Sequence, residues 1–135
     1  METKEFLQRA LGNSGFYCVF ASHGSEDRRV QKFYDSLDAV LTEAHELDES
    51  GFDAYFALAT FEEANSRKVT NIKQLRSFFL DLDCGPSKGY RDQNDAVIAL
   101  RSFCKKLELP KPLLVNSGRG VHAYWFLSEP VSLEE

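Results

Sequence analysis

Two aspartates end an otherwise apolar segment, SFFLDLD, at positions 77–83. Side chains of an extended strand alternate between its faces, so Asp81 and Asp83 should point the same way, about 6–7 Å apart. Two ionised carboxylates at that distance favour a hard divalent cation between them, such as Mg²⁺ or Mn²⁺. The pattern therefore predicts a metal site, with two solvated acids beside a turn as the structural alternative.

A glycine-rich segment, NSGRGVHAYWFL, follows at positions 116–127. Gly118 and Gly120 allow a tight turn and a close approach to a ligand, and successive backbone amides there can form an anion-binding nest. Arg119 presents a fork of donors suited to phosphate oxygens. Together with Ser117 and His122, the turn indicates a phosphate-binding site. An ordinary hairpin followed by a hydrogen-bonded sheet histidine is the alternative.

The elements that must position these residues can be read from the apolar spacing. Alternating or continuous apolar runs predict strands, and spacings of three and four predict helices. Helices are expected at 3–11, 30–47 and 93–107, and strands at 16–22, 52–61, 77–83, 113–116 and 121–127. This order indicates an α/β (α+β) fold in which helices flank a mixed β-sheet.

Composition limits the class of protein. A chain of 135 residues that is 43% hydrophobic can build the core of a single globular domain, expected to span 1–135. The sequence has no apolar run of membrane-spanning length and no hydrophobic signal core, and its three cysteines form no CxxC pair. A cytoplasmic protein without a disulfide framework or a zinc knuckle is therefore expected.

The two motifs together resemble the archaeo-eukaryotic primase (AEP) superfamily. FFLDLD matches the family's first motif of alternating hydrophobic and acidic residues, and Gly120-Val121-His122 matches its second, a small residue, any residue and a histidine. The nearest branch is the primase-polymerase domain at the N-terminus of phage and plasmid replication proteins. The resemblance covers residues 78–127 and implies the N-terminal portion of an AEP core with an RRM-like element.

The resemblance also implies roles for individual residues. Asp81 and Asp83 would bind the catalytic Mg²⁺ or Mn²⁺, and His122 would contact the phosphates of an incoming nucleoside triphosphate. Ser117 and Arg119, with Gly120, would complete the triphosphate contact. The implied activity is nucleotidyl transfer by a DNA primase or polymerase in the replication of a phage or mobile element.

One part of the family pattern has no match here. The family carries a third motif, a further carboxylate on a later strand, and Glu129, Glu134 and Glu135 do not stand in such a context. The chain is therefore expected to be the N-terminal part of a larger catalytic domain. A helicase domain or protein is an expected partner.

Charge suggests where nucleic acid could bind. The net charge is −5, but acids dominate only residues 1–63, and basic side chains outnumber acids in 64–135. A local basic surface matters more to a phosphate backbone than the total charge. A set of four basic residues is predicted to contact single-stranded template or primer: Arg67, Lys68, Lys73 and Arg76.

Two other function classes compete with the polymerase interpretation. A non-catalytic module could bind single-stranded nucleic acid through Arg67, Lys73, Arg76 and surface aromatics, independently of metal. A metal-dependent phosphoesterase could use Asp81, Asp83 and His122. Metal dependence separates the first alternative from the polymerase, and release of phosphate or nucleotides identifies the second.

Overall fold

The computed structural model describes residues 1–133 and divides the chain into two compact units. Unit 1 takes Met1–Arg76 and the C-terminal segment from Ser128, and unit 2 takes Ser77–Leu127. Strands β5 (Ile72–Asp83) and β7 (Gly120–Val131) each contribute residues to both units. Glu134 and Glu135 lie outside the described residues. That the units form a single domain, the N-terminal part of a larger one, stays a prediction.

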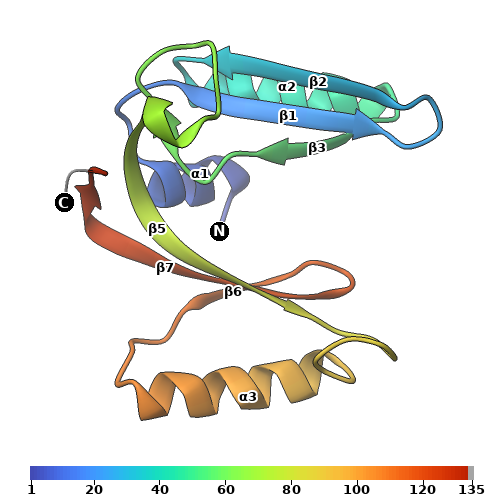
Figure 1. Ribbon diagram of the computed structural model, residues 1–135, viewed down its shortest axis with the longest axis vertical. Helices are drawn as coiled ribbons and strands as arrows, with labels where there is room; N and C mark the ends of the chain where they lie inside the picture. Colours follow the sequence, from blue (N-terminus) through green and yellow to red (C-terminus); the bar gives the residue numbers. More distant parts are fainter. Residues whose placement is uncertain (134–135) are drawn as a thin grey trace. The chain divides into compact units, whose positions relative to one another are not determined.

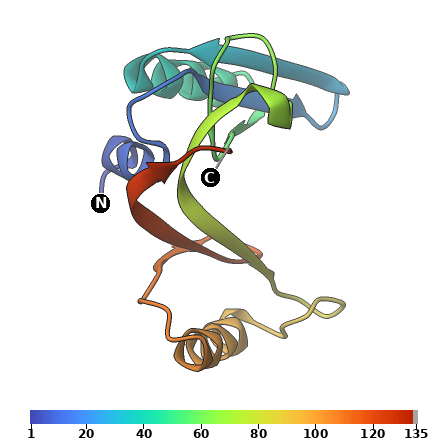
Figure 2. The ribbon, with the colours of Figure 1, turned by 60° about the vertical axis from the view of Figure 1, so that its left-hand side comes forward.

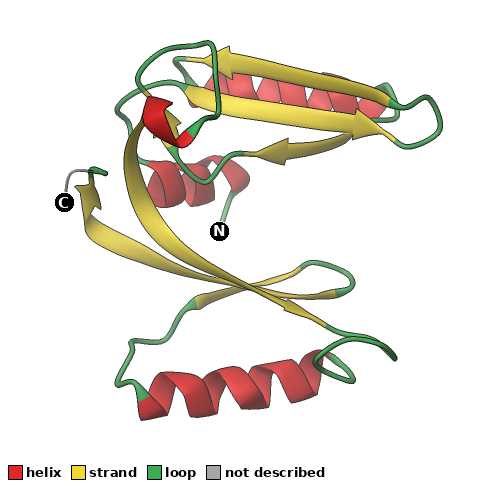
Figure 3. Cartoon of the chain, in the orientation of Figure 1, coloured by secondary structure: helices red, strands yellow, loops and turns green. Residues whose placement is uncertain are grey.

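Unit 1 is built on a three-stranded sheet of order β2-β1-β3 in which both strand pairs are antiparallel (Figures 1 and 3). A two-residue strand, β4, pairs with the start of β5. The elements are α1 (Thr3–Leu11), β1 (Tyr17–His23), β2 (Arg28–Tyr34), α2 (Leu37–Glu49), β3 (Asp53–Phe56), β4 (Thr60–Phe61) and the 3₁₀ turn η1 (Val69–Asn71).

The two helices of unit 1 pack on one face of this sheet. Val19 of β1 is buried and lies with Phe6 and Leu7 of α1 and Val40 of α2 around one small apolar cavity. Because strand side chains alternate, Phe20 and Ser22 point to the opposite face, where the cavity that they line has no helix residue among the described residues. A second buried cluster, Cys18, Ala59 and Phe61, includes a β1 residue of this opposite face, so the sheet of unit 1 has core residues on both sides.

The helix expected from residue 30 begins later. Val30 and Phe33 lie in β2, which pairs with β1 along its whole length, from His23 with Arg28 to Tyr17 with Tyr34. The side-chain hydroxyl of Ser36 then accepts a hydrogen bond from the Ala39 amide at 3.2 Å, and α2 starts at Leu37. An apolar residue at every third or fourth position fits a helix, but pairing with β1 decides the backbone of this segment.

Unit 2 places helix α3 (Gln93–Lys106) against one face of strands in the order β5-β7-β6, with β6 at Leu113–Asn116 (Figure 2). Asp92 caps α3 by accepting a hydrogen bond from the Asp95 amide at 2.9 Å. The buried core between helix and strands consists of Leu82, Ala96, Leu100, Val121 and Ala123.

The predicted α+β class with helices packed on sheet is confirmed. The expected boundaries of α1 and β6 agree with the structure, and that of α3 agrees to within one residue. Strands β5 and β7 are longer than predicted, and the expected strand at 52–61 is divided into β3 and β4. Within residues 1–133, every helix is too short or too polar to cross a bilayer.

Candidate metal and nucleotide site

Asp81 and His122 lie together on the face of β5 and β7 that points away from α3. Their closest atoms, Asp81 Oδ1 and His122 Nε2, are 3.5 Å apart. Phe79 lies edge-on to the His122 ring at a centroid distance of 5.1 Å and contacts Tyr124 at 5.0 Å. The first acidic residue and the histidine, predicted from separate motifs, thus occupy one surface.

The strand alternation that predicts this arrangement is visible in the burial. Leu82 is buried against α3, with Val121 and Ala123 from β7. Asp81 and Asp83, the residues on either side of Leu82, are exposed. The Asp81 side chain is 49% exposed and the His122 side chain 31% exposed, so a ligand can reach both.

The glycine hairpin lies directly against the end of β5. The Cys84 amide donates a 2.9 Å hydrogen bond to the Arg119 carbonyl. A Cβ atom on Gly120 would overlap the carbonyl oxygen of Leu82 and lie 3.3 Å from the Cα of Asp83. Only glycine allows this approach, which brings the phosphate-binding candidates next to the second acid.

Two residues that sequence reasoning did not single out hold the turn in place. The Asn116 side-chain oxygen accepts a hydrogen bond from the Gly118 amide at 2.8 Å and another from Gln93 Nε2 at 2.7 Å. Gln93 Nε2 also donates to the Gly120 carbonyl at 3.1 Å. Because Gln93 stands at the start of α3, far from the hairpin in sequence, no local motif marks this link.

Replacing Asn116 with alanine is expected to weaken the binding of a nucleoside triphosphate about fivefold, since the turn loses an acceptor bond worth about 1 kcal/mol. The affinity is measured by titration with Mn²⁺ present. Asn94→Ala, an exposed asparagine in α3, is the control and should bind as the wild type does. Equal affinities for the Asn116 and Asn94 variants would show that the Asn116 hydrogen bonds to the turn do not contribute to triphosphate binding.

Ser117 and Arg119 lie in the same turn as Gly120. The Ser117 amide donates to the Gly120 carbonyl at 3.2 Å, which closes the loop. The side chains of Ser117 and Arg119 are exposed, and Gly118 adopts a positive φ of 88°. All the predicted residues of this site belong to unit 2: Asp81, Asp83, Ser117, Arg119, Gly120 and His122. That they act as one site stays a prediction.

Negative charge accumulates around the end of β5. Burial raises the pKa of the Tyr124 phenol, and the Asp81 carboxylate raises it further. Burial likewise raises the pKa of the Cys84 thiol, with smaller contributions from Asp92, Asp83 and Asp95. A bound cation would offset this local field.

The donor set fits a hard divalent cation held by few protein ligands. Across residues 1–133 there is no cluster of three or more His, Cys, Asp or Glu side chains placed to hold a metal. Two exposed carboxylates from one strand nevertheless suit Mg²⁺ or Mn²⁺, which commonly keeps water and takes substrate phosphates as further ligands. A site of this kind would bind metal better together with a nucleotide than alone.

The four basic residues predicted to contact nucleic acid all belong to unit 1. Arg67 stacks over the Phe20 ring on the face of the β2-β1-β3 sheet opposite α1 and α2. Arg76 lines a different cavity, beside α1, and donates to the Ser128 carbonyl at 3.2 Å. Lys68 is exposed and Lys73 half-buried. Their role stays a prediction.

The chain was compared with protein families, with curated sequences and with solved structures. No protein-family model matches the chain. A replication protein of Clostridium perfringens is 29% identical over 98 residues, which make up 73% of this chain and 24% of that protein. The solved AEP domain of the cyanophage S-2L primase-polymerase is similar, with a TM-score of 0.57 and 20% identity, over 89% of this chain and 57% of that one.

The chain thus spans only part of the length of either protein. The structural likeness extends over both units, although the two motifs stand within residues 78–127. The resemblance indicated by those motifs is therefore confirmed at the level of the fold: this chain has the fold of the AEP domain of a primase-polymerase.

Proposed function

We propose that the chain carries the metal-binding and nucleotide-binding residues of a primase-polymerase that transfers nucleotides during the replication of phage or mobile-element DNA. The observation that supports this most is the 3.5 Å approach of His122 to Asp81, beside a glycine turn bound to the end of the same strand. The chain's AEP fold and its similarity to a replication protein agree with it.

Asp81 and Asp83 are the proposed ligands of Mg²⁺ or Mn²⁺. When bound, the ion supplies positive charge that activates the attacking 3′-hydroxyl and stabilises the leaving pyrophosphate. The two carboxylates are exposed on one strand face, so they can hold the ion where a triphosphate reaches it. The nucleotide substrates would be nucleoside triphosphates.

The residues of the hairpin would bind and orient the triphosphate. Arg119 can donate two parallel hydrogen bonds to phosphate oxygens, and Ser117 can add a hydroxyl donor. His122, when protonated, adds a charged donor on the side facing Asp81. Fixed positive groups in these positions stabilise the charge that grows on the phosphates in the transition state.

A template-directed enzyme also requires single-stranded DNA, and Arg67, Lys68, Lys73 and Arg76 are the proposed contacts to template and primer phosphates. We place the chain at the N-terminal part of a larger catalytic domain in a cytoplasmic replication protein. That protein would supply the third carboxylate and would work with a helicase. The similarity to 24% of a replication protein agrees with a chain that is part of a longer protein.

Replacing His122 with alanine tests the proposal. Primer extension by the full protein with Mn²⁺ is expected to slow about 100-fold, the usual loss on removing one donor to the charge of a transition state. His45→Ala, an exposed histidine of α2 that pairs with Glu49, is the control and should keep full activity. Normal extension by the His122 variant would contradict the assigned role.

A non-catalytic module that binds single-stranded nucleic acid is the second candidate. It is favoured by a cavity in unit 1 that is lined by aromatic residues and arginines and does not include the acids of β5. Binding that is strong without metal, combined with no primer extension by the full protein, would select this candidate. Release of phosphate or nucleotides without extension would instead indicate a phosphoesterase.

A further inference from the structure

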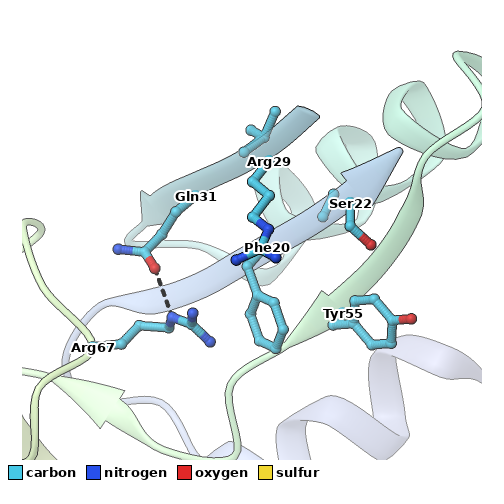
Figure 4. Close-up of a pocket in the computed structure, with 8 residues that line it drawn as sticks. Phe20, Ser22, Arg29, Gln31, Tyr55 and Arg67 are labelled. Carbon is cyan, nitrogen blue, oxygen red and sulfur yellow. Dashed lines mark hydrogen bonds between the residues drawn. The ribbon is translucent and has the colours of Figure 1, made fainter. Parts of the chain in front are cut away.

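The face of the β2-β1-β3 sheet opposite α1 and α2 carries a compact set of aromatic and cationic side chains. In the strand register, Phe20 of β1 lies between Gln31 of β2 and Tyr55 of β3. Two pairs further along, and therefore on the same face, Ser22 lies opposite Arg29. We call these residues, with Arg67 from the loop before η1, the sheet patch (Figure 4): Phe20, Ser22, Arg29, Gln31, Tyr55 and Arg67.

The aromatic part of the sheet patch is a stacked pair of rings, of which Tyr55 is the exposed one. The Phe20 and Tyr55 rings are nearly parallel, at an interplanar angle of 16° and a centroid distance of 5.4 Å. Tyr55 is 50% exposed, although a large aromatic residue of a soluble domain is more often covered. The tyrosine thus presents ring surface on which a planar group can stack.

Arg67 is held over this platform. Its guanidinium carbon lies 4.0 Å from the centroid of Phe20, and its Nε donates a 2.6 Å hydrogen bond to the side chain of Gln31 (Figure 4). The terminal nitrogens of a guanidinium fixed in this way can still donate to an anion. The arrangement places a phosphate-binding group beside an aromatic stack.

The charge of the sheet patch has one sign. The cavity that it surrounds has a volume of about 460 Å³, and its lining contains Arg29 and Arg67 but no acidic side chain among the described residues. Asp53, the nearest acid in the strand register, pairs with Ser22 and lies outside that lining. Two arginines without an acid in the lining favour an anionic ligand.

We propose that the sheet patch binds single-stranded nucleic acid, with an unpaired base stacked on Tyr55 and the adjoining phosphates bound by Arg29 and Arg67. Aromatic faces flanked by basic side chains are the usual means of holding unpaired strands with little sequence preference. The sheet patch shares no residue with the metal site and needs no metal. This inference rests on the nucleic-acid role proposed above for Arg67 and assigns that role a defined site; Asp81 and Asp83 take no part in it, so binding measured in EDTA can fail without affecting the proposed metal site.

The test is a fluorescence-anisotropy titration of the 135-residue chain with a labelled single-stranded oligodeoxythymidine, in EDTA. The wild type is expected to bind it. Tyr55→Ala should weaken binding about tenfold through loss of stacking, and Tyr55→Phe should restore most of it. Arg29→Ala should weaken binding about fivefold and lower the slope of log affinity against log salt by about one.

Arg28→Ala is a matched control, because Arg28 is the neighbour of Arg29 on β2 but points to the other face, over Phe52. It removes the same charge and should change the affinity less than twofold. Circular dichroism would show that each variant is folded.

Four results would overturn the proposal. The first is that the wild type does not bind the oligonucleotide, and the second is that the Arg28 and Arg29 variants lose equal affinity. The third is that a folded Tyr55→Ala variant binds normally. The fourth is that duplex DNA or a free mononucleotide binds as tightly as the single strand.

Discussion

Replacing Asp81 and Asp83 together with asparagine is expected to remove Mn²⁺-dependent binding of a nucleoside triphosphate, with an affinity loss of more than about 100-fold. Each carboxylate supplies a charged oxygen ligand, and a neutral amide is a much weaker ligand for a hard cation. Calorimetric titration of the chain with a triphosphate, with and without Mn²⁺, measures the effect.

The same double variant should fold normally. Both aspartates are exposed, and two like charges on one strand face repel each other, so removing them should leave the thermal midpoint unchanged or raise it. Asp48→Asn with Asp53→Asn changes the net charge equally at exposed positions of unit 1 and should bind normally. Metal-dependent binding retained by the Asp81 and Asp83 variant would refute the assignment of these ligands.

Replacing Gly120 with alanine is expected to destabilise unit 2 by about 3 kcal/mol, because the new methyl group would overlap the Leu82 carbonyl. Relief requires the hairpin to move away from β5, and this breaks the bond between the Cys84 amide and the Arg119 carbonyl. We expect the thermal midpoint to fall by about 10 °C and triphosphate binding to be lost with it.

Gly89→Ala provides the comparison for this variant. Gly89 also belongs to unit 2, and a Cβ atom there would meet nothing within 4 Å. Its stability and triphosphate affinity should match those of the wild type. If Gly120→Ala were as stable as Gly89→Ala, the close approach of the hairpin to β5 would not exist in solution.

The sequence predicts the fold best where local and tertiary preferences agree. The apolar spacing of residues 93–107 coincides with the face that α3 buries, and Asp92 caps its first turn. Between residues 30 and 36 they disagree: helical spacing competes with pairing to β1, and the pairing decides. The start of β5 was also missed: the strand was expected only from residue 77, and the pairing of Ile72 and Gln74 with β4 extends it toward the N-terminus.

The candidate site follows from two short motifs, because strand alternation alone places Asp81 on the exposed face and β7 alternates in the same way to present His122. The sequence alone does not predict that β5 and β7 are neighbours, or that Gln93 donates a hydrogen bond to the turn. Both contacts join segments that are far apart in the chain. The sheet patch was missed for the same reason, because its residues meet only when β1, β2 and β3 pair.

The most direct measurement is a crystal structure of the chain with Mn²⁺ and a non-hydrolysable nucleoside triphosphate. Anomalous scattering would locate the Mn²⁺ ion, and the electron density would locate the triphosphate. We expect the Mn²⁺ peak between the carboxylates of Asp81 and Asp83, with the triphosphate contacting Arg119 and His122. A peak at other acids, or a triphosphate bound away from the glycine hairpin, would contradict the proposed site.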